Sequence, residues 1–570
     1  MQDALSYTRR ATPLWQNLRS GKPGGIIFGS GAPMARIYNA QSGNRLPIDA
    51  GYSTRRLLIN ETLSRIECDV LVVGGGINGA AIARDAAGRG LSVVLCEKDD
   101  LAAHTSSASS KLVHGGLRYL ENFEFGHVRK ALAEREVLLR CAPHIIRPLR
   151  FVMPHDQGQR PAWMIRVGLF LYDRLARREF LPGAESLALR QHAAGQPLKA
   201  RFTRGFAYSD AWVDDARLVV LNALDAALHG ARVLTHTRCI AARRTGRQWQ
   251  ATLVGPDGAP ATVVARALVN AAGPWALEFL QLLAPAPARQ AQRLVKGSHI
   301  IVRRLFDHPC AYIFQHPDRR IVFAIPYERD FTLIGTTDLD YHGDLDHVAI
   351  SAAEVDYLCR LVGRYFEQQI GAQDVLCSFA GVRPLLGDAA RSAAATSRDY
   401  RLLHDGDGAP LLSVFGGKIT TARKLAEEAL DWLAPALGHA GRHWTAGACL
   451  PGGDIFGATP CARAVLEFDT FIAAQQRRYA WLAPGLVARY ARAYGTRMAL
   501  LLDGCSGMAG MGEEILPGLF ALELAYLVRH EWAHSGADVL WRRSKLGLHL
   551  PPASTALLDA VMHRQRSMSA

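Results

Sequence analysis

The pattern of apolar and polar positions along the chain changes abruptly near Cys68. Residues 1–66 show no sustained periodicity and are interrupted by glycine, proline and serine, as in SGKPGG and GSGAP. After them, DVLVVGGG is typical of a buried parallel strand, INGAAIARDAAGRG of a helix built from small residues, and LSVVLCEK of a second strand. This order predicts a βαβ unit at the start of the folded part of the chain.

The middle of the chain, from about residue 100 to 430, alternates helical and strand-like segments. A helix is expected over 127–142, and four strand-like runs with no helix between them follow between 296 and 338. Their sequences are KGSHIIVRR, AYIFQH, RIVFAIPYE and FTLIGTTD. Closely spaced strands usually pair antiparallel, so we expect an antiparallel sheet inserted into a doubly wound domain.

Beyond residue 450 the pattern becomes helical, with helices expected over 488–502 and 520–534. The predicted fold class is α/β: a Rossmann-like domain with an inserted antiparallel β-sheet domain for the substrate, followed by a C-terminal helical domain. We place these parts at 67–445, discontinuous and intertwined, and at 446–570. Residues 1–66 are expected to be a disordered, dispensable basic extension.

Charge and cysteine content limit the kinds of partner. The 570 residues carry a formal net charge of +14, which suggests attraction to a membrane surface or a phosphorylated substrate. The arginines are scattered rather than arranged in blocks, which argues against nucleic acid. Ten cysteines without a C-x-x-C pair indicate reduced thiols in a cytosolic protein rather than disulfides or a zinc site. We expect no membrane-spanning helix and no secretory signal.

A glycine motif, GGGING at 74–79, lies between the first predicted strand and its helix and fits G-x-G-x-x-G. Gly74 allows a tight turn, Gly76 lets the backbone approach a pyrophosphate, and Gly79 lets the helix pack on the strand. Glu97 ends the second strand, where a carboxylate binds ribose hydroxyls and disfavours a 2′-phosphate. The motif therefore predicts a bound dinucleotide other than NADP.

The segment HTSSASSKLVHGGLRYLE at 104–121 favours FAD over NAD, because small hydroxyl side chains can approach a flavin ring and donate hydrogen bonds. Two further glycine-rich pieces, at 269–276 and 413–430, offer more backbone to the cofactor, and the helix in the second could stabilise a reduced flavin. We therefore expect FAD. The residues expected to contact it are Gly74, Gly76, Ile77, Asn78, Gly79, Glu97, Thr105, Ser106, Ser109, Ser110, Lys111, Leu112, His114, Gly115, Ala272, Gly273, Gly417, Lys418, Ile419 and Thr420.

These motifs, with YSDAWVDDARLV, KGSHI, IGTTD, GVRPL and LWRRSKLGLHL, carry a family resemblance. From about residue 68 onward the chain resembles the FAD-dependent, aerobic glycerol-3-phosphate dehydrogenases. The resemblance implies oxidation of sn-glycerol 3-phosphate to dihydroxyacetone phosphate by hydride transfer to flavin N5, with electrons passed to ubiquinone. It also implies a cytoplasmic protein attached peripherally to the inner face of the cytoplasmic membrane. A homodimer is an open expectation.

The substrate phosphate is a dianion that calls for arginine or lysine. The candidates are Arg118, Arg383, Arg398 and Lys418, and Tyr119 could add a hydroxyl contact. Arg118 and Arg383 are the leading candidates for phosphate binding because each follows an apolar segment that is interrupted by glycine.

The base that takes the C2 hydroxyl proton is a second expected role. His299 and His114 are the candidates, because imidazole titrates near neutral pH. A histidine within a strand is more often a satisfied core residue, so the assignment stays open. Arg383 could instead hold the developing alkoxide.

Two other segments admit a functional and a structural interpretation. His530-Glu531-Trp532-Ala533-His534 matches H-E-x-x-H, but no third-ligand pattern follows, so we expect no metal. Residues 161–178, PAWMIRVGLFLYDRLARR, suit either an interfacial membrane helix or a buried core helix.

Two rival functions remain open from the sequence. One is a related flavin oxidase that passes electrons to oxygen. The other is a non-catalytic FAD-binding scaffold tethered to a membrane.

Overall fold

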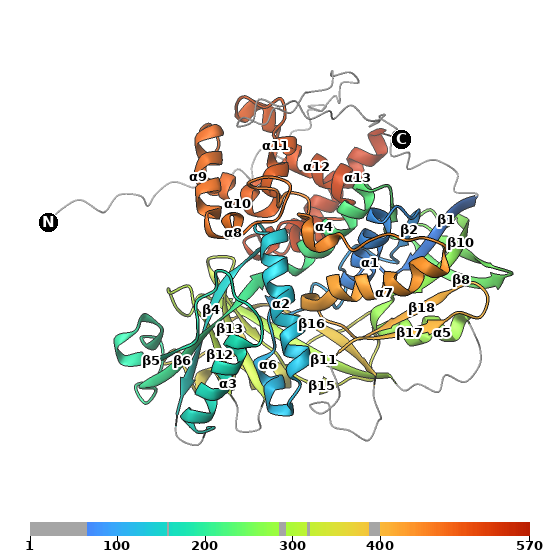
Figure 1. The fold of residues 1–570 in the computed structure, drawn as a ribbon. Coiled ribbons are helices and arrows are strands. Elements are labelled where there is room, and N and C mark those ends of the chain that lie inside the picture. The colour runs from blue at the N-terminus through green and yellow to red at the C-terminus, as the bar shows by residue number, and fades with distance from the viewer. Residues whose placement is uncertain (1–64, 157–158, 284–291, 316–319, 387–398, 570) are drawn as a thin grey trace. The chain divides into compact units, whose positions relative to one another are not determined.

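The computed structural model of the protein describes residues 65–156, 159–283, 292–315, 320–386 and 399–569 (Figure 1). Arg398 and all but the last two residues of the proposed extension lie outside the described residues. The expected βαβ unit consists of β1 (Arg65–Val73), α1 (Ile77–Gly88) and β2 (Val93–Cys96). Arg65 and Ile66 already pair with β10, at Thr262 and Val263, so the proposed extension ends two residues too late.

The first sheet has the order β17-β18-β10-β1-β2-β7, in which the five strands from β18 to β7 run parallel. β8 and β9 extend it as an antiparallel hairpin attached to β10. Its other strands are β7 (Arg232–Leu234), β8 (Arg238–Thr245), β9 (Gln248–Val254), β10 (Pro260–Asn270), β17 (Arg401–Asp405) and β18 (Leu411–Phe415).

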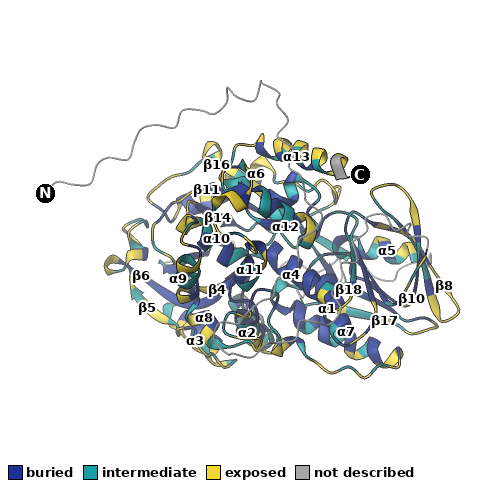
Figure 2. Cartoon of the chain, turned by 90° about the horizontal axis from the view of Figure 1, so that it is seen from above, coloured by how far each residue is buried: buried dark blue, intermediate teal, exposed yellow. Residues whose placement is uncertain are grey.

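Both faces of this sheet are buried, which explains why its strands are continuously apolar. Val70 and Val72 face α1, α4 (Asp215–Leu228) and α7 (Ala422–Ala436), which lie side by side in Figure 1. The alternate residues Leu71 and Val73 face the β8–β9 hairpin and α5 (Ala276–Leu283). The dark blue of α1 and α4 in Figure 2 reflects this burial.

The second sheet has the order β15-β11-β14-β13-β12-β4-β6-β3, with β16 beside β11 and β5 beside β6. Its strands are β3 (Leu112–Val113), β4 (Ile146–His155), β5 (Glu185–Ala188), β6 (Arg204–Val213), β11 (Gln292–Arg303), β12 (Ala311–Gln315), β13 (Ile321–Tyr327), β14 (Phe331–Gly335), β15 (Leu339–Asp340) and β16 (Val375–Leu386). The four expected strands pair antiparallel, but β12 also pairs parallel with β4.

Three helices cover the second sheet. α6 (Ala352–Gly363) contributes Leu358 and Val362 to an aromatic-rich core with β11–β14. On the other side, α2 (Phe125–Cys141) and α3 (Ala162–Arg174) join a core with β4, β6 and β13. The helix expected over 127–142 is thus found, slightly earlier in the chain.

The C-terminal helices form a core of their own between Phe468 and Met562. They are α9 (Phe468–Arg478), α10 (Pro484–Tyr494), α11 (Met498–Leu501), α12 (Ala521–Glu531) and α13 (Ser554–Ser569), with a small hairpin of β19 (Glu514–Leu516) and β20 (Leu519–Phe520). The preceding helix α8 (Ala462–Leu466) instead packs Val465 into the core of the first sheet. The helix expected over 488–502 is interrupted at Gly495, which has a φ of 54°. Among the described residues, no helix has the length and apolar content needed to cross a bilayer.

Candidate active site

The carboxyl ends of β1, β10 and β18 lie at one edge of the first sheet, because these neighbouring strands run parallel. Each end carries one of the three glycine turns found in the sequence. Ala271 N donates to Val73 O at 2.8 Å, which joins the second turn to the first. Asn78 Nδ2 donates to Gly416 O at 3.1 Å, which joins the third turn to the first.

Each of the three motif glycines occupies its position for a different structural reason. Gly74 has a φ of 111°, and a Cβ there would lie 2.4 Å from the Ala271 carbonyl oxygen. A Cβ at Gly79 would lie 1.9 Å from the Gly74 carbonyl oxygen, so helix and turn can only meet around a glycine. A Cβ at Gly76 would point toward Ser106, 3.2 Å from its Oγ.

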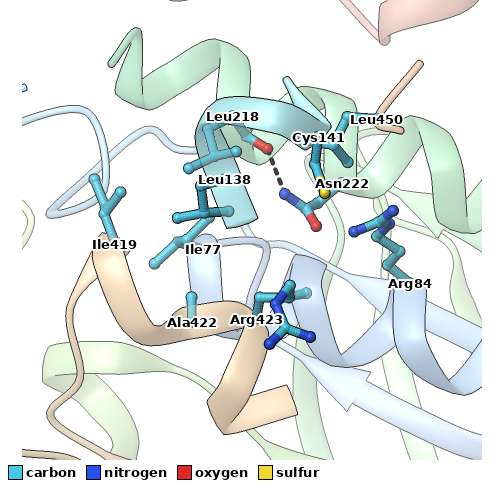
Figure 3. Close-up of a pocket in the computed structure, with 11 residues that line it drawn as sticks. Ile77, Arg84, Leu138, Cys141, Leu218, Asn222, Ile419, Ala422, Arg423 and Leu450 are labelled. Atoms are coloured by element: carbon cyan, nitrogen blue, oxygen red, sulfur yellow. Dashed lines mark hydrogen bonds between the residues drawn. The ribbon is translucent and has the colours of Figure 1, made fainter. Parts of the chain in front are cut away.

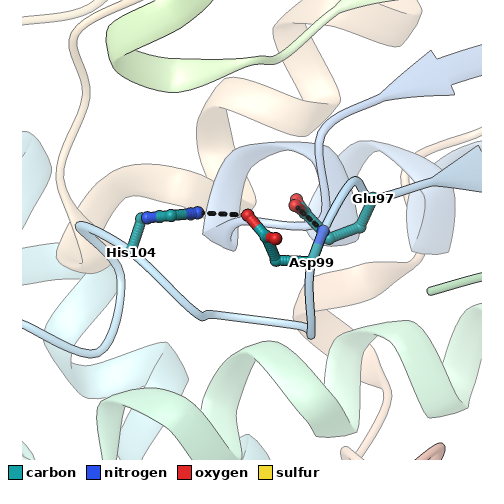
Figure 4. Close-up of side chains that lie close together, drawn as sticks. All are labelled: Glu97, Asp99 and His104. Carbon is teal, nitrogen blue, oxygen red and sulfur yellow. Dashed lines mark hydrogen bonds and ion pairs between the residues drawn. The ribbon is translucent and has the colours of Figure 1, made fainter. Parts of the chain in front are cut away.

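Glu97 follows β2 and is oriented by the backbone. Its Oε2 accepts a hydrogen bond from Gly75 N at 2.6 Å and its Oε1 accepts one from Asp99 N at 2.9 Å. Each carboxylate oxygen can accept a second bond, for instance from a ribose hydroxyl. Asp99 in turn lies 2.7 Å from His104 Nε2, and this contact lowers the pKa of the Asp99 carboxyl (Figure 4).

The hydroxyl-rich segment lies across this edge and connects the two sheets. Ser106 Oγ accepts a hydrogen bond from Ile77 N, in the first turn of α1, at 3.0 Å. Thr105 Oγ1 donates to Val382 O of β16 at 2.8 Å, and Ser110 Oγ lies 2.8 Å from His299 Nε2 of β11. The segment therefore spans from the cofactor edge of the first sheet to β11 and β16 of the second.

The buried ammonium group of Lys111 is bound by groups of the protein itself. Its buried Nζ donates to both carboxylate oxygens of Asp215, at 2.9 and 2.8 Å, and to Ser107 O at 2.9 Å. Those three bonds match the three donors of an ammonium group. Burial lowers the pKa of Lys111, and Asp215 opposes this effect. We therefore assign Lys111 to holding the segment, together with Ser109, whose Oγ donates to the same carboxylate at 2.8 Å.

Of the expected catalytic residues, His299 is buried and Arg383 is partly exposed. His299 stacks on Phe379 with ring centroids 4.9 Å apart. Burial, and then Arg383 and Lys111, hold the pKa of His299 well below its usual value, so the ring is neutral at physiological pH. Arg383 Nη1 donates to Asp338 Oδ1 at 3.0 Å.

The backbone around His114 is held by one expected residue, Thr420, and by Tyr172 and Asp210, which were not expected site residues. His114 N donates to Thr420 Oγ1 at 3.3 Å, which joins the segment to the third glycine turn. Gly115 N donates to the Tyr172 hydroxyl at 2.8 Å, and that hydroxyl lies 2.8 Å from the buried Asp210 carboxylate. The YSDAW motif was a signal for Asp210, but nothing local indicated Tyr172.

Two expected substrate residues come together from opposite parts of the chain. Lys418 Nζ lies 3.8 Å from the ring centroid of Tyr119, in cation–π geometry. The same Nζ lies 2.6 Å from His127 Nε2, and His127 Nδ1 lies 3.3 Å from Asp399 Oδ2. His127 was not predicted, because one histidine in an amphipathic helix carries no signal. Arg118 lies on the same 3₁₀ helix as Tyr119, Leu117–Asn122, but its side chain is not described.

A small cavity behind α1 is not the substrate site. It lies between α1, α2, α4 and α7, measures about 10 Å³, and has room for about one water molecule (Figure 3). Ile77, Leu138 and Ile419 supply much of its apolar lining, and Asn222 donates to Leu218 O at 2.7 Å beside it.

The H-E-x-x-H pattern does not form a metal-binding face. α12 ends at Glu531, and Trp532 has a φ of 53°, so His534 is not one helical turn above His530 as the sequence suggested. The buried Glu531 forms a two-pronged ion pair with Arg217 of α4, including a 2.9 Å bond from Nη2 to Oε1. Glu531 therefore serves to hold α12 against α4.

The edge of the first sheet fits a dinucleotide cofactor. α1 begins at a glycine that has no side chain to cap it. Apart from Ile77 N–H, which donates to Ser106 Oγ, the N–H groups of its first turn would be offered to a pyrophosphate. Glu97 stands at the ribose position and Ser106 beside the cradle. These residues would hold the adenosine and the pyrophosphate, and the 105–110 hydroxyls would lie toward the flavin.

Comparison with known proteins agrees with this fit. The family model described as FAD dependent oxidoreductase matches residues 69–423. A glycerol-3-phosphate dehydrogenase of Pseudomonas aeruginosa is 55% identical, over 87% of this chain and 95% of its own. The aerobic glycerol-3-phosphate dehydrogenase of Escherichia coli is 49% identical, over 85% of this chain and 94% of its own. D-erythritol 1-phosphate dehydrogenase of Brucella abortus is also 49% identical, over 86% and 96%.

Among solved structures, the glycerol-3-phosphate dehydrogenase of Bacillus halodurans in complex with FAD superposes with a TM-score of 0.68 at 27% identity. The match covers 89% of this chain and 90% of that one. Sequence and fold thus agree over nearly the whole described part of the chain, and the C-terminal helices that follow residue 423 are included. The chain belongs to the FAD-dependent oxidoreductases and, within them, to the glycerol-3-phosphate dehydrogenase family.

Proposed function

We propose that the protein oxidises the C2 hydroxyl of sn-glycerol 3-phosphate to the ketone of dihydroxyacetone phosphate and passes the electrons to a membrane quinone such as ubiquinone. The names of its relatives support the substrate. The observation that carries the proposal is the meeting of Lys418 and Tyr119 beside the third glycine turn of the cofactor edge. An ammonium and a phenol there suit a phosphate monoester.

The phosphate would be held by Lys418 and Tyr119 together with Arg118, which the same 3₁₀ helix carries. Lys418 is oriented by His127, which lies within hydrogen-bond distance of its ammonium. Binding the phosphate end would fix the distance from the anion to C2 and so orient the C2–H bond toward the cofactor.

The chemical step separates a hydride and a proton. FAD, when bound, accepts the C2 hydrogen with its electron pair. The hydroxyl proton needs an unprotonated base, and His299 is unprotonated because burial and nearby cations lower its pKa. The same shift weakens it as a base, so the transfer would depend on stabilisation of the alkoxide. Since His299 Nε2 contacts Ser110 Oγ, the proton would reach it through that hydroxyl. The Arg383 guanidinium would stabilise the alkoxide that develops at C2.

The test is anaerobic reduction of the bound flavin. Sn-glycerol 3-phosphate should bleach the flavin absorbance near 450 nm, about in proportion to the enzyme, while glycerol at equal concentration should not. A soluble ubiquinone analogue should then restore the absorbance faster than air does. A flavin that stays oxidised with the substrate would refute the proposal and favour the scaffold.

Two outcomes would point to rivals. Hydrogen peroxide formed in air at the rate of substrate oxidation would favour the oxidase. Faster bleaching by D-erythritol 1-phosphate would move the substrate to the longer polyol phosphate on which the Brucella abortus relative is named to act.

The proposal includes peripheral attachment to the inner face of the cytoplasmic membrane through α3. Ile165, Leu169 and Tyr172 of this helix are buried, whereas Trp163, Val167 and Phe170 are 65%, 51% and 54% exposed. The exposed residues have helical spacing and so form one apolar face. This arrangement differs from a helix buried on all sides, which was the alternative interpretation of the sequence.

The surroundings of that face suit an anionic lipid surface. Phe123 is 79% exposed at the end of the 3₁₀ helix that carries Tyr119, and this helix packs against α3. Arg174 lies over the Phe170 ring at 3.9 Å, so it can keep its charge at the headgroups while the ring enters the acyl region. A quinone dissolved in the bilayer would then approach the enzyme near the substrate-binding helix.

A further inference from the structure

The C-terminal helices lie outside the family model, which ends at residue 423. The sequence WRRSK at 541–545 is part of the family resemblance, yet the proposed chemistry gives it no role. Arg542 and Arg543 of this sequence bind residues 100–111, the segment between β2 and β3. We name these residues the cofactor segment. These contacts are long-range in sequence and buried, so they are unlike ordinary surface ion pairs.

Asp100 begins the cofactor segment, three residues after Glu97, and is 1% exposed. Arg543 donates to it from both ends of its guanidinium: Nη1 to Oδ2 at 2.6 Å and Nη2 to Oδ1 at 2.7 Å. Arg542 Nε adds a third bond to Oδ2 at 2.5 Å. A bidentate fork fixes both the position and the orientation of the carboxylate, so it also fixes the backbone that carries it.

Arg543 is itself immobilised on the C-terminal side. Its Nε and Nη2 donate to the carbonyl oxygen of Glu531, at 3.1 and 2.6 Å, where α12 ends. The two arginines end a short π-helix, Asp538–Arg543, a rare backbone form that is often found at functional sites.

The other end of the cofactor segment is tied to the same C-terminal stretch. Ser109 and Lys111 bind Asp215, and the preceding residue, Asp214, lies 3.2 Å from Lys545 Nζ. Asp214 also caps α4 by accepting from Arg217 N. Both ends of the cofactor segment are thus connected to WRRSK, directly at Asp100 and through Asp215 and Asp214 at the other end. Ser106 lies between these ends and contacts the first turn of α1.

From these contacts we infer that the C-terminal helices act as a clamp that positions the cofactor segment for FAD, with Arg543 as the main positioning residue. The clamp acts through Asp100 on Glu97 and Ser106, the two side chains that would face the ribose and the pyrophosphate. Loosening it should weaken FAD binding more than it weakens the fold.

The test compares two matched arginine forks, each to a buried carboxylate, in the holoenzyme. Arg543→Lys keeps the charge but loses the second prong to Asp100. Arg489→Lys makes the same change in a fork to Glu523, whose bonds are 2.7 and 2.7 Å and which lies wholly within the C-terminal helices. FAD release after dilution, followed by flavin fluorescence, gives the dissociation rate, and retitration with FAD gives Kd. Thermal melting of each protein reports on the fold.

Arg543→Lys should raise the FAD Kd about tenfold or more, mainly through faster release, whereas Arg489→Lys should change it less than about twofold at a similar loss of Tm. Hydrogen exchange of amides 100–111 should accelerate in the first variant only. An unchanged Kd in Arg543→Lys, or an equal rise in Arg489→Lys, would overturn the inference.

A milder variant keeps the inference testable if Arg543→Lys fails to fold. Arg542 is partly exposed, makes one bond to Asp100 and also pairs with Asp538. Asp538 keeps its hydrogen bonds from His534 N and Ser535 N without it, so Arg542→Gln should leave the fold intact. It should raise the FAD Kd by a smaller factor, about two- to fivefold. A parental Kd in this folded variant would also count against the clamp.

Discussion

Gly76 is the motif glycine whose replacement should affect cofactor binding most directly. Gly74 and Gly79 are needed for backbone packing, but Gly76 borders only the space next to Ser106. Gly76→Val would place a branched side chain where the pyrophosphate binds, so the purified protein should be folded and colourless. Flavin absorbance at 450 nm relative to protein measures this.

Gly485→Val is the matched control, because a Cβ there meets no atom within 4 Å and the residue is exposed on α10, among the C-terminal helices. It should keep full flavin content. Full flavin in Gly76→Val would contradict the placement of the cofactor on α1.

Arg118 is expected to bind the substrate phosphate, and its backbone position beside Tyr119 supports this expectation. Loss of a charge-assisted hydrogen bond costs about 1.5–3 kcal/mol, so Arg118→Ala should lower kcat/KM for sn-glycerol 3-phosphate about ten- to a hundredfold with the flavin retained. Steady-state kinetics with a quinone analogue measures it, and lysine should rescue only partly.

Glycerol, which lacks the phosphate, distinguishes two explanations for a lower kcat/KM in Arg118→Ala. If Arg118 binds phosphate, the variant and the parent should oxidise glycerol equally poorly. Equal impairment on both substrates would place Arg118 at the reacting carbon or in folding. The phosphate role would then fall to Lys418, Arg383 or Arg398.

At the level of elements, α3 should determine membrane attachment. Transfer of a valine side chain from water to an apolar phase is worth about 1.5 kcal/mol, so Val167→Glu should weaken binding to anionic vesicles about tenfold or more. Val528→Glu, at an exposed valine of α12, is the matched control and should bind as the parent does. Cosedimentation with vesicles measures both, and high salt should release part of the bound protein because no described helix spans the bilayer.

Equal binding of Val167→Glu and the parent would move the attachment to another surface. Release by detergent alone would indicate a deeper insertion than a peripheral helix provides.

At the level of the whole molecule, buried histidines should make the protein sensitive to acid. Burial, and then Arg217, lower the pKa of His144 to about 3, against about 6.5 when unfolded. Between these values the unfolded chain binds a proton that the folded chain does not, so the free energy of unfolding falls as the pH falls. From pH 7 to pH 5 this histidine alone should cost about 2 kcal/mol.

His144→Gln should flatten this dependence, whereas His563→Gln, at an exposed position of α13, should leave it unchanged. Urea unfolding at pH 5, 6 and 7 measures the slope. His299 adds to the effect in the parent, since its pKa is also lowered. A parental slope in His144→Gln would mean that other groups cause the acid sensitivity.

The extent of the folded unit can be tested by truncation. A chain that begins at Ser64 keeps all of β1 and should fold, bind FAD and turn over, because the described pairing of β1 with β10 starts at Arg65. A chain that begins at Val70 loses five residues of this central strand and should not fold. Circular dichroism and flavin content distinguish them. Misfolding of the Ser64 chain would show that the preceding residues are needed.

The sequence alone determined the features that depend on local chemistry. The strand, glycine turn and helix at 69–88 follow from a continuous apolar run, a motif that only glycine satisfies, and a run of small residues. The cofactor edge could be predicted from them, since parallel strands place their carboxyl ends together. Tyr119 and Lys418 were identified as candidates in the same way, each beside a glycine turn.

Tertiary structure alone decided which of these residues contact one another and which charges are already paired within the protein. Lys111 was expected to contact the cofactor, and its buried partner Asp215, 104 residues further along the chain, was not expected. The H-E-x-x-H pattern was expected to bind no metal because a third ligand was missing, but only the fold showed that Glu531 pairs with Arg217. His127 gave no local signal at all. Helical and strand periodicity report only which face of an element is buried, whereas ion pairs, forks and stacked rings depend on which elements the chain brings together.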